Sequence, residues 1–279
     1  MATRIYGGLD TRFWQQRPLI GMVHLRPLPG SPLYAGEPMH AILEHAIADA
    51  RALQEGGADA VMVENYFDVP FAKGSLPPHT VAALTRCVQA VREAVSLPVG
   101  VNALRNDAET AIAVAHVCGG QFVRINVYVG AAVTDQGIIE GAARAAVLYR
   151  KALNADVALW ADIGVKHAAP LGTTRIESDA RDAVERGLAD ALILTGDATG
   201  LPVNPEDIRR VRDVVPQTPL LVGSGLTPSS AAAMLACANG AIVGTWLKRD
   251  GAVHLPVDAH RVRALKAAMQ SVHPVEAPW

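Results

Sequence analysis

The chain has little cysteine and few aromatic residues, and its charges nearly balance. The three cysteines, Cys87, Cys118 and Cys237, lie far apart in apolar stretches, which argues against a disulfide framework and against a zinc site. We expect them to be core thiols in a reducing cytoplasm. The 25 basic and 27 acidic residues give a net charge of −2 and form no basic run, so nucleic acid is not expected as a partner.

Long apolar runs are also missing. No run reaches the roughly 18 residues that span a bilayer, and the first residues lack the apolar core of a signal peptide. We therefore expect a cytoplasmic protein with no integral membrane segment. The length of 279 residues suits one barrel domain. No linker divides it, so we predict a single domain over 1–279, with an N-terminal lead-in (1–17) and a C-terminal tail (270–279).

Short apolar runs rich in Val, Ile and Leu recur along the chain, with helical segments between them. The runs are continuously apolar, which is typical of parallel strands buried on both faces. The predicted strands are 18–24, 59–64, 98–103, 121–126, 157–163, 190–195, 219–223 and 240–245. Eight strand–helix units predict a (β/α)₈ TIM barrel. An open doubly wound sheet is the alternative, but its glycine-rich fingerprint does not follow the first run.

Three long loops are predicted, over 25–38, 65–78 and 128–140. Each follows a strand, so in a barrel each lies on the catalytic face, where long loops usually act as lids or binding loops. Pro228 suits the first turn of the seventh helix, and Thr227 suits its N-cap.

Glycines follow the last two predicted strands. Gly223, Ser224 and Gly225 come after the seventh strand, and Gly244 and Thr245 close the eighth. Phosphate-binding barrels hold the anion between these two loops, against backbone N–H groups and the start of a short helix. Glycine allows the backbone to approach a phosphate. The plain alternative is that these glycines only make tight turns.

A second group of polar residues surrounds the end of the fifth strand. Asp162 ends an apolar run, so its carboxylate can abstract a proton, bind a metal or hold a sugar hydroxyl. Lys166, in the following loop, can hold an anionic group or form a Schiff base. His167 can be a base, a ligand or a packing residue.

Glu64 ends the second strand and is the other candidate carboxylate, with His24 beside it as a further catalytic candidate. Glu64 and Asp162 can divide acid and base roles or share a divalent metal, although no motif specifies a cofactor. Hydrogen bonding that only ties the strand ends together is the structural alternative. The remaining polar residues at strand ends are predicted to bind substrate: Asn102, Arg124, Asn126, His167, Thr195 and Asp197.

Seven segments together resemble the BtpA/SgcQ family, which is placed by fold among the ribulose-phosphate-binding barrels. They are GMVHLRPLPGSP (21–32), DAVMVEN (59–65), VGVN (99–102), FVRINV (122–127), VKHA (165–168), VGSG (222–225) and GAIVGT (240–245). The resemblance implies a TIM barrel. The family takes its name from a cyanobacterial factor needed for photosystem I accumulation at thylakoid membranes, and other relatives lie near carbohydrate-utilisation genes. It supplies no established catalytic residues. A polar residue, often His, is expected near Gly164, and this chain lacks it.

Two classes of function follow. The first is an enzyme acting on a small phosphorylated sugar-like metabolite by proton transfer, aldol cleavage or glycosyl-bond cleavage, with Asp162 and Glu64 as acid and base and Lys166 on an anionic group. The second is a non-catalytic assembly factor, and a sugar-phosphate sensor is a third variant. Because barrels of this class often form dimers or rings, we also expect a homo-oligomer.

Overall fold

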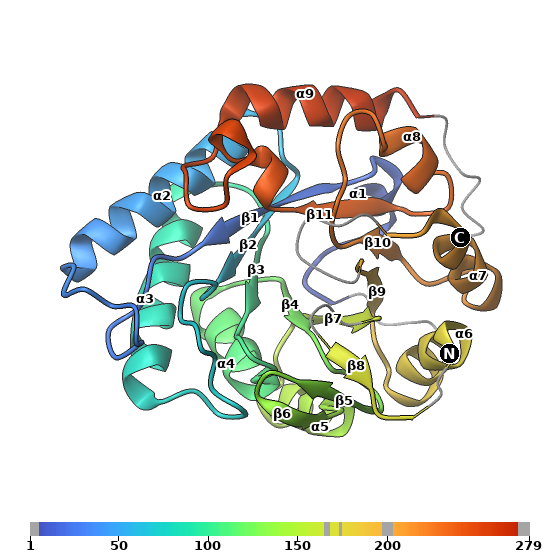
Figure 1. Cartoon of the computed structure of the whole chain (residues 1–279), viewed down its shortest axis with the longest axis horizontal. Helices are drawn as coiled ribbons and strands as arrows, with labels where there is room; N and C mark the ends of the chain where they lie inside the picture. Colours follow the sequence, from blue (N-terminus) through green and yellow to red (C-terminus); the bar gives the residue numbers. More distant parts are fainter. Residues whose placement is uncertain (1–5, 165–167, 173–174, 197–202, 273–279) are drawn as a thin grey trace.

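The computed structural model describes residues 6–164, 168–172, 175–196 and 203–272. Eight parallel strands close into a barrel in the order β1–β11–β10–β9–β7–β4–β3–β2 (Figure 1). They are β1 (Leu19–His24), β2 (Ala60–Glu64), β3 (Val99–Asn102), β4 (Phe122–Ile125), β7 (Ala158–Ile163), β9 (Ala191–Leu194), β10 (Leu220–Val222) and β11 (Gly240–Val243). Each lies within a predicted range, so the TIM-barrel prediction is confirmed.

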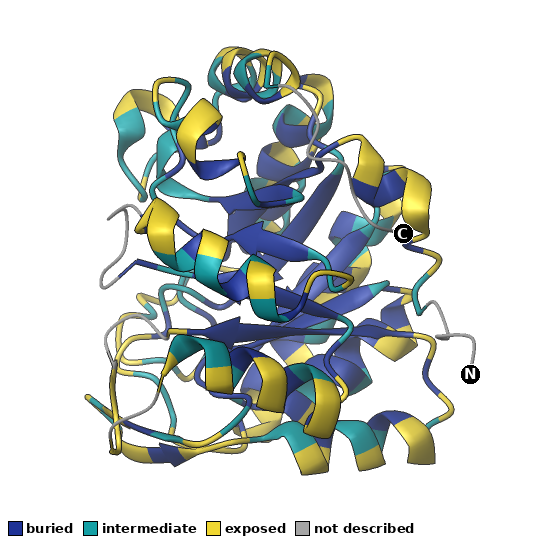
Figure 2. Ribbon diagram, turned by 90° about the vertical axis from the view of Figure 1, so that its right-hand side faces the viewer, coloured by how far each residue is buried: buried dark blue, intermediate teal, exposed yellow. Residues whose placement is uncertain are grey.

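The helices surround the barrel, with buried faces toward the strands and exposed faces outward (Figure 2). They are α2 (Met39–Glu55), α3 (Pro78–Ala94), α4 (Ala108–Cys118), α5 (Ala143–Ala152), α6 (Ile176–Arg181) with the π-helical η1 (Asp182–Arg186), α7 (Pro205–Val214), α8 (Ala231–Met234) and α9 (Ala259–Gln270). The predicted apolar stripes supply buried residues on α3 and α9. Within the described ranges, no helix has the length and apolarity needed to cross a membrane.

Large side chains fill the part of the barrel interior that lies toward the amino-terminal ends of the strands. Trp160 stacks on Phe122 with ring centroids 3.8 Å apart. Gly100 makes room for this pair, because a Cβ there would lie 2.0 Å from the Phe122 ring. Trp14, from the short helix α1 (Thr11–Gln15), packs 5.6 Å from Trp160 and closes the amino-terminal end. Among the described residues, the barrel interior is therefore closed at this end, and the opposite end, formed by the carboxyl ends of the strands, is the mouth.

The amino-terminal end of the barrel is held by polar side chains that bridge neighbouring strands. A residue just before every second strand accepts a hydrogen bond from an N–H near the start of the strand beside it. The pairs are Asp59 with Leu19 (2.7 Å), Gln121 with Val99 (2.8 Å), Asp190 with Leu159 (2.7 Å) and Asn239 with Leu220 (2.8 Å). These bonds satisfy backbone groups at strand starts, so they serve stability.

The loop predicted over 128–140 is wrong, because this stretch contains a hairpin. β5 (Ala131–Thr134) pairs antiparallel with β6 (Gly137–Glu140), and β8 (Ala168–Pro170) joins β5 on its other side. Ala132 and Ile139 pack with Val127 in a small separate apolar cluster, which gives the hairpin its own support.

The start of the seventh helix also differs from the prediction. α8 begins at Ala231, and residues 228–230 form a turn before it. Thr227 stabilises this turn rather than the helix, since its N–H donates to Ser230 Oγ over 3.0 Å. Two of the three cysteines, Cys87 and Cys118, are buried as expected, while Cys237 is half-buried.

Candidate functional site

The mouth of the barrel carries a layer of polar side chains. Side chains alternate along a strand, so the position two residues beyond an interior apolar side chain also faces inward. Trp160 fills the interior on β7, and Asp162 follows it two residues later; Met62 and Glu64 are related in the same way on β2. The inward positions at the mouth are His24, Glu64, Asn102, Arg124, Asp162, Thr195, Gly223 and Gly244. This alternation explains why the apolar runs end in polar residues or glycine.

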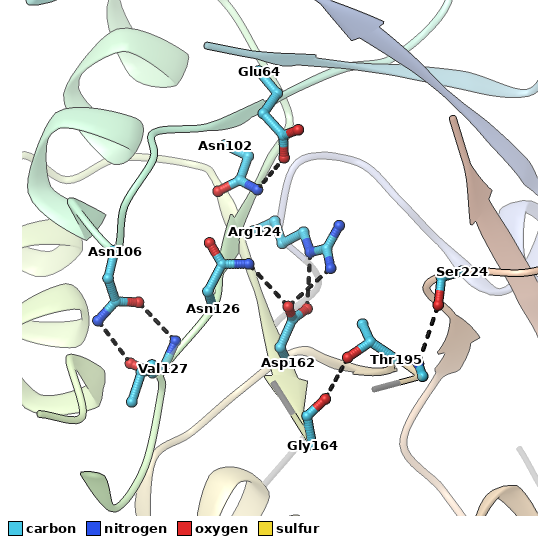
Figure 3. A network of polar contacts seen from close by, with 11 residues as sticks. Glu64, Asn102, Asn106, Arg124, Asn126, Val127, Asp162, Gly164, Thr195 and Ser224 are labelled. Carbon is cyan, nitrogen blue, oxygen red and sulfur yellow. Dashed lines mark hydrogen bonds and ion pairs between the residues drawn. The ribbon is translucent and has the colours of Figure 1, made fainter. Parts of the chain in front are cut away.

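Asp162 is the centre of a buried ion pair (Figure 3). Arg124 donates from Nε to Asp162 Oδ1 and from Nη2 to Oδ2, both over 2.8 Å, and Asn126 Nδ2 donates to Oδ2 over 2.9 Å. Burial would lower the pKa of Arg124, but the charge and hydrogen bonds of Asp162, with the charge of Glu64, raise it. Asp162 therefore positions a charged guanidinium, because three donors already occupy its carboxylate.

Glu64 forms the second centre at the mouth. Its Oε1 accepts a 2.6 Å hydrogen bond from Asn102 Nδ2, and its Oε2 lies 3.6 Å from His24 Nε2. The His24 ring stacks on Tyr66, with centroids 4.4 Å apart. On the other strand beside β1, a Cβ at Gly244 would lie 2.7 Å from His24 Cε1. Glycine at 244 is thus needed to seat the imidazole next to the carboxylate.

One pocket of about 260 Å³ joins these groups to the glycines of the last two strands. We call the segments 223–227 and 244–245 the glycine loops; both line the pocket. The polar side chains on its other walls are His24, Glu64, Arg105, Arg124, Asn126 and Asp162. The pocket therefore brings together most of the described residues that the sequence singled out. Asn102 and Thr195 do not line it.

Gly223 and Gly225, two glycines of the phosphate prediction, have different surroundings. A Cβ at Gly223 would lie 2.5 Å from Ile193 and 2.7 Å from Thr195, so this glycine allows β10 to pack against β9. Gly225 has a φ of +69°, which favours glycine for the turn itself. Thr245 opens the short helix η2 (Thr245–Leu247), whose first N–H groups have no acceptor within the helix.

The remaining predicted residues divide into two groups. Thr195 donates a hydrogen bond to the carbonyl oxygen of Gly164, and the Gly196 N–H donates to Ser224 Oγ over 3.1 Å. These contacts tie together the ends of β7, β9 and β10 (Figure 3). Lys166, His167 and Asp197 lie outside the described residues.

The family model described as "BtpA family" matches residues 15–271 of the chain. The chain belongs to the BtpA family. It is 44% identical over 257 residues to "Photosystem I biogenesis protein BtpA" of Synechocystis, covering 92% of this chain and 89% of that protein. It is 46% identical over 252 residues to an uncharacterized protein of Thermococcus kodakarensis, covering 90% and 95% of the two chains. SgcQ of Escherichia coli is 30% identical over 260 residues, with coverage of 92% and 95%.

Solved structures with the same fold are more distant in sequence. Thiamine phosphate pyrophosphorylase from Pyrococcus furiosus is 12% identical, with a TM-score of 0.58 and coverage of 94% of this chain and 100% of that one. Orotidine 5'-phosphate decarboxylase from Pyrococcus horikoshii is 14% identical, with a TM-score of 0.58 and coverage of 91% and 100%. At this identity the likeness shows the barrel fold of this BtpA-family chain.

Several pocket residues of this BtpA-family barrel were missed by the sequence analysis: Tyr66, Phe71, Arg105 and Trp246. Arg105 follows β3 by three residues. Burial lowers its pKa, against the opposing effects of Asp135 and Asp162. Tyr66, Phe71 and Arg105 lie in loops and Trp246 lies in the one-turn helix η2, so no strand or helix period indicates their direction. The available signal was that the scarce aromatic residues recur soon after strand ends.

The loops around the mouth are fixed to one another by asparagine side chains. Asn65 accepts from the Leu104 N–H over 2.7 Å and donates to the Leu104 carbonyl over 3.1 Å. Asn106 binds Val127 in the same two-bond manner, over 2.7 and 3.0 Å. These clamps join the loops after β2, β3 and β4, so they preorganise this side of the pocket.

The predicted use of Glu64 and Asp162 as shared metal ligands finds no support in the geometry. Both oxygens of Asp162 face the Arg124 guanidinium, whose positive charge repels a cation. Within the described part of the chain, no group of three His, Cys, Asp or Glu side chains is arranged to hold a metal ion.

Proposed function

We propose that this protein is an enzyme that binds a small phosphorylated, sugar-like metabolite and moves a proton with Glu64 and His24. One observation carries the proposal. One pocket is lined by both glycine loops, by the Glu64–His24 pair and by the Arg124–Asp162 ion pair.

The glycine loops are the proposed phosphate site. Gly225 and Thr245 line the pocket from two neighbouring strand ends. This placement matches the anion site of phosphate-binding barrels. Two fold neighbours carry phosphorylated compounds in their names, thiamine phosphate and orotidine 5'-phosphate, which makes a phosphate ester the first class of ligand to test.

The charges of Arg124, Asp162 and Glu64 in the pocket favour proton transfer over glycosyl cleavage. Arg124 is held charged and oriented by Asp162, so it can stabilise negative charge on a substrate oxygen as Glu64 removes a proton from the neighbouring carbon. Glycosyl cleavage develops positive charge on the sugar, which a guanidinium disfavours. Schiff-base aldol cleavage needs a lysine, and the lysine that the sequence offers for it, Lys166, lies outside the described residues.

The photosystem I relative makes an assembly role the alternative. An ion pair removed from water costs free energy that apolar packing does not, and at the mouth this cost arises in residues that line the pocket, unlike the Arg150–Asp190 pair at the other end of the barrel. Arg124 and Asp162 expose only 6% and 1% of their side chains. This pair therefore supports a role for the mouth in ligand chemistry.

Two measurements test the proposal. A thermal-shift screen of sugar phosphates, with and without divalent metals, should find a phosphate ester that stabilises the protein. Deuterium incorporation from D₂O into that ester, followed by NMR, should then be catalysed by the wild type and lost in Glu64→Gln. Glu206→Gln, an exposed change on α7, is the control. Binding without exchange would contradict the enzyme in favour of a sensor, and no phosphate binding would overturn the proposal.

A further inference from the structure

We propose that the phosphorylated ligand also carries a planar aromatic or heteroaromatic ring, which packs on an aromatic wall of the pocket. The wall consists of Tyr66, Phe71 and Trp246. This inference rests on the proposed function and deepens it by naming the substrate class.

The wall is distinctive because aromatic residues are scarce in this chain. They make up 5% of the sequence, yet three of the 21 residues that line the pocket are aromatic. Phe122 and Trp160 inside the barrel are fully buried, whereas Tyr66, Phe71 and Trp246 are only half-buried. Apolar ring surface that is exposed in a pocket becomes buried when a ligand covers it, and this burial favours binding.

The residues of the wall follow two strands that lie on either side of β1. Trp246 follows β11, Tyr66 and Phe71 follow β2, and β1 lies between those strands in the barrel. β1 supplies His24, whose ring stacks on Tyr66. The wall thus runs from a glycine loop to the Glu64–His24 pair. A ring on the wall would place the central part of a ligand between the phosphate and the proposed base.

Trp246 is fixed before any ligand arrives. The guanidinium carbon of Arg261, from α9, lies 4.4 Å from the centroid of its ring, and Arg261 Nε donates to its carbonyl oxygen over 2.6 Å. Arg261 does not line the pocket, whereas Trp246 does. Arg261 therefore covers the indole from outside the pocket. An aromatic side chain held in one orientation provides a flat contact at little entropic cost.

The shape of the wall distinguishes a ring from a flexible chain. Met22, Ile242 and Val243 also line the pocket and would accept any apolar group. Flat aromatic side chains add offset or edge-to-face contacts that only another π system returns in full. A ring-bearing phosphate should therefore bind more tightly than a phosphate with an alkyl group of similar apolar area.

Isothermal titration with three phosphates tests this inference: ribose 5-phosphate, uridine 5'-monophosphate and hexyl phosphate. Uridine monophosphate should bind the wild type about tenfold more tightly than either of the other two, since stacking on an aromatic side chain is typically worth that factor or more. Trp246→Leu should reduce the advantage to less than about threefold. It should leave the affinity for ribose 5-phosphate unchanged.

Two further variants guard the result. Phe71→Leu changes the wall away from the glycine loops and should also reduce the advantage, so it decides the matter if Trp246→Leu does not fold. Tyr149→Leu, on α5 and outside the pocket, should have no effect. Equal affinity for all three phosphates, or hexyl phosphate binding as tightly as the nucleotide, overturns the inference and leaves the proposed function standing. Failure of every phosphate to bind overturns both.

Discussion

The two ends of the barrel use similar residues for opposite purposes. At the amino-terminal end, Asp59, Gln121, Asp190 and Asn239 each accept a hydrogen bond from a backbone N–H of a neighbouring strand. At the mouth, Glu64, Asn102, Asn126 and Asp162 bind one another or a charged side chain. The first arrangement completes the fold, whereas the second concentrates charge where a ligand can reach it.

The two ends also differ in whether their buried side-chain acceptors have hydrogen-bond partners. Asn126 donates to Asp162, but its Oδ1 is buried and has no hydrogen-bond partner among the residues that the structure describes. Asn126 lines the pocket. A buried acceptor without a partner costs free energy, which no acceptor at the amino-terminal bridges incurs.

The largest expected effect comes from breaking a bridge at the amino-terminal end. Asp190→Ala removes the acceptor of the Leu159 N–H and the carboxylate that pairs with buried Arg150 over 2.5 Å. The free energy of unfolding in urea should fall by about 4 kcal/mol, while phosphate affinity stays unchanged. Asp190→Asn keeps an oxygen acceptor for Leu159 and should lose less. Reduced phosphate affinity in a folded Asp190→Asn protein would show that the two ends are not independent.

The ion pair at the mouth should respond differently to removal of both partners. Arg124→Met alone leaves the Asp162 carboxylate buried without its cation and should cost about 3 kcal/mol in urea unfolding. Arg124→Met/Asp162→Leu should return stability to within about 1 kcal/mol of the wild type, because an apolar pair replaces a buried ion pair at little cost. Proton exchange should nevertheless remain abolished. A double variant as unstable as the single one would assign this pair to the fold.

A smaller effect is expected at the contact between Gly244 and His24. Gly244→Ala places a methyl 2.7 Å from His24 Cε1, so the ring must move, at a cost of about 1–2 kcal/mol in unfolding free energy. Proton exchange should slow more than binding weakens. The double variant Gly244→Ala/His24→Ala removes the overlap and should recover the lost stability, and a failure to recover would show that His24 is not the group that requires glycine.

The smallest effect concerns Asp68, a carboxylate in the loop after β2. Like Asp59 and Asp190 at the amino-terminal end, it accepts a hydrogen bond from a backbone N–H. Asp68 accepts from the Leu28 N–H over 2.8 Å, yet burial raises its pKa. A raised folded-state pKa gives stability that is present below the unfolded pKa and lost as pH rises through the folded one. As the pH rises from 4 to 7, the wild type should therefore lose stability relative to Asp68→Asn. Parallel pH profiles of urea unfolding would contradict this assignment.

Much of the fold was predictable because buried parallel strands leave continuous apolar runs. The hairpin β5–β6 was missed because its four-residue strands are largely exposed and give no such run. Strand ends indicated Glu64 and Asp162 by position. The barrel prediction made β4 and β7 neighbours, but the pairing of Asp162 with Arg124 could not be predicted, since it depends on the register between these strands. The residues of the aromatic wall lie in loops and in the one-turn helix η2, where the sequence has no period to indicate direction.

The position of a bound phosphate tests the central claim most directly. A crystal structure of the wild type soaked with ribose 5-phosphate should place the phosphate between Gly225 and Thr245, with the sugar directed toward Glu64 and Arg124. Gly225→Trp should leave this position empty under the same soak. A phosphate bound elsewhere in the wild type, or density for the ligand outside the barrel mouth alone, would contradict the account.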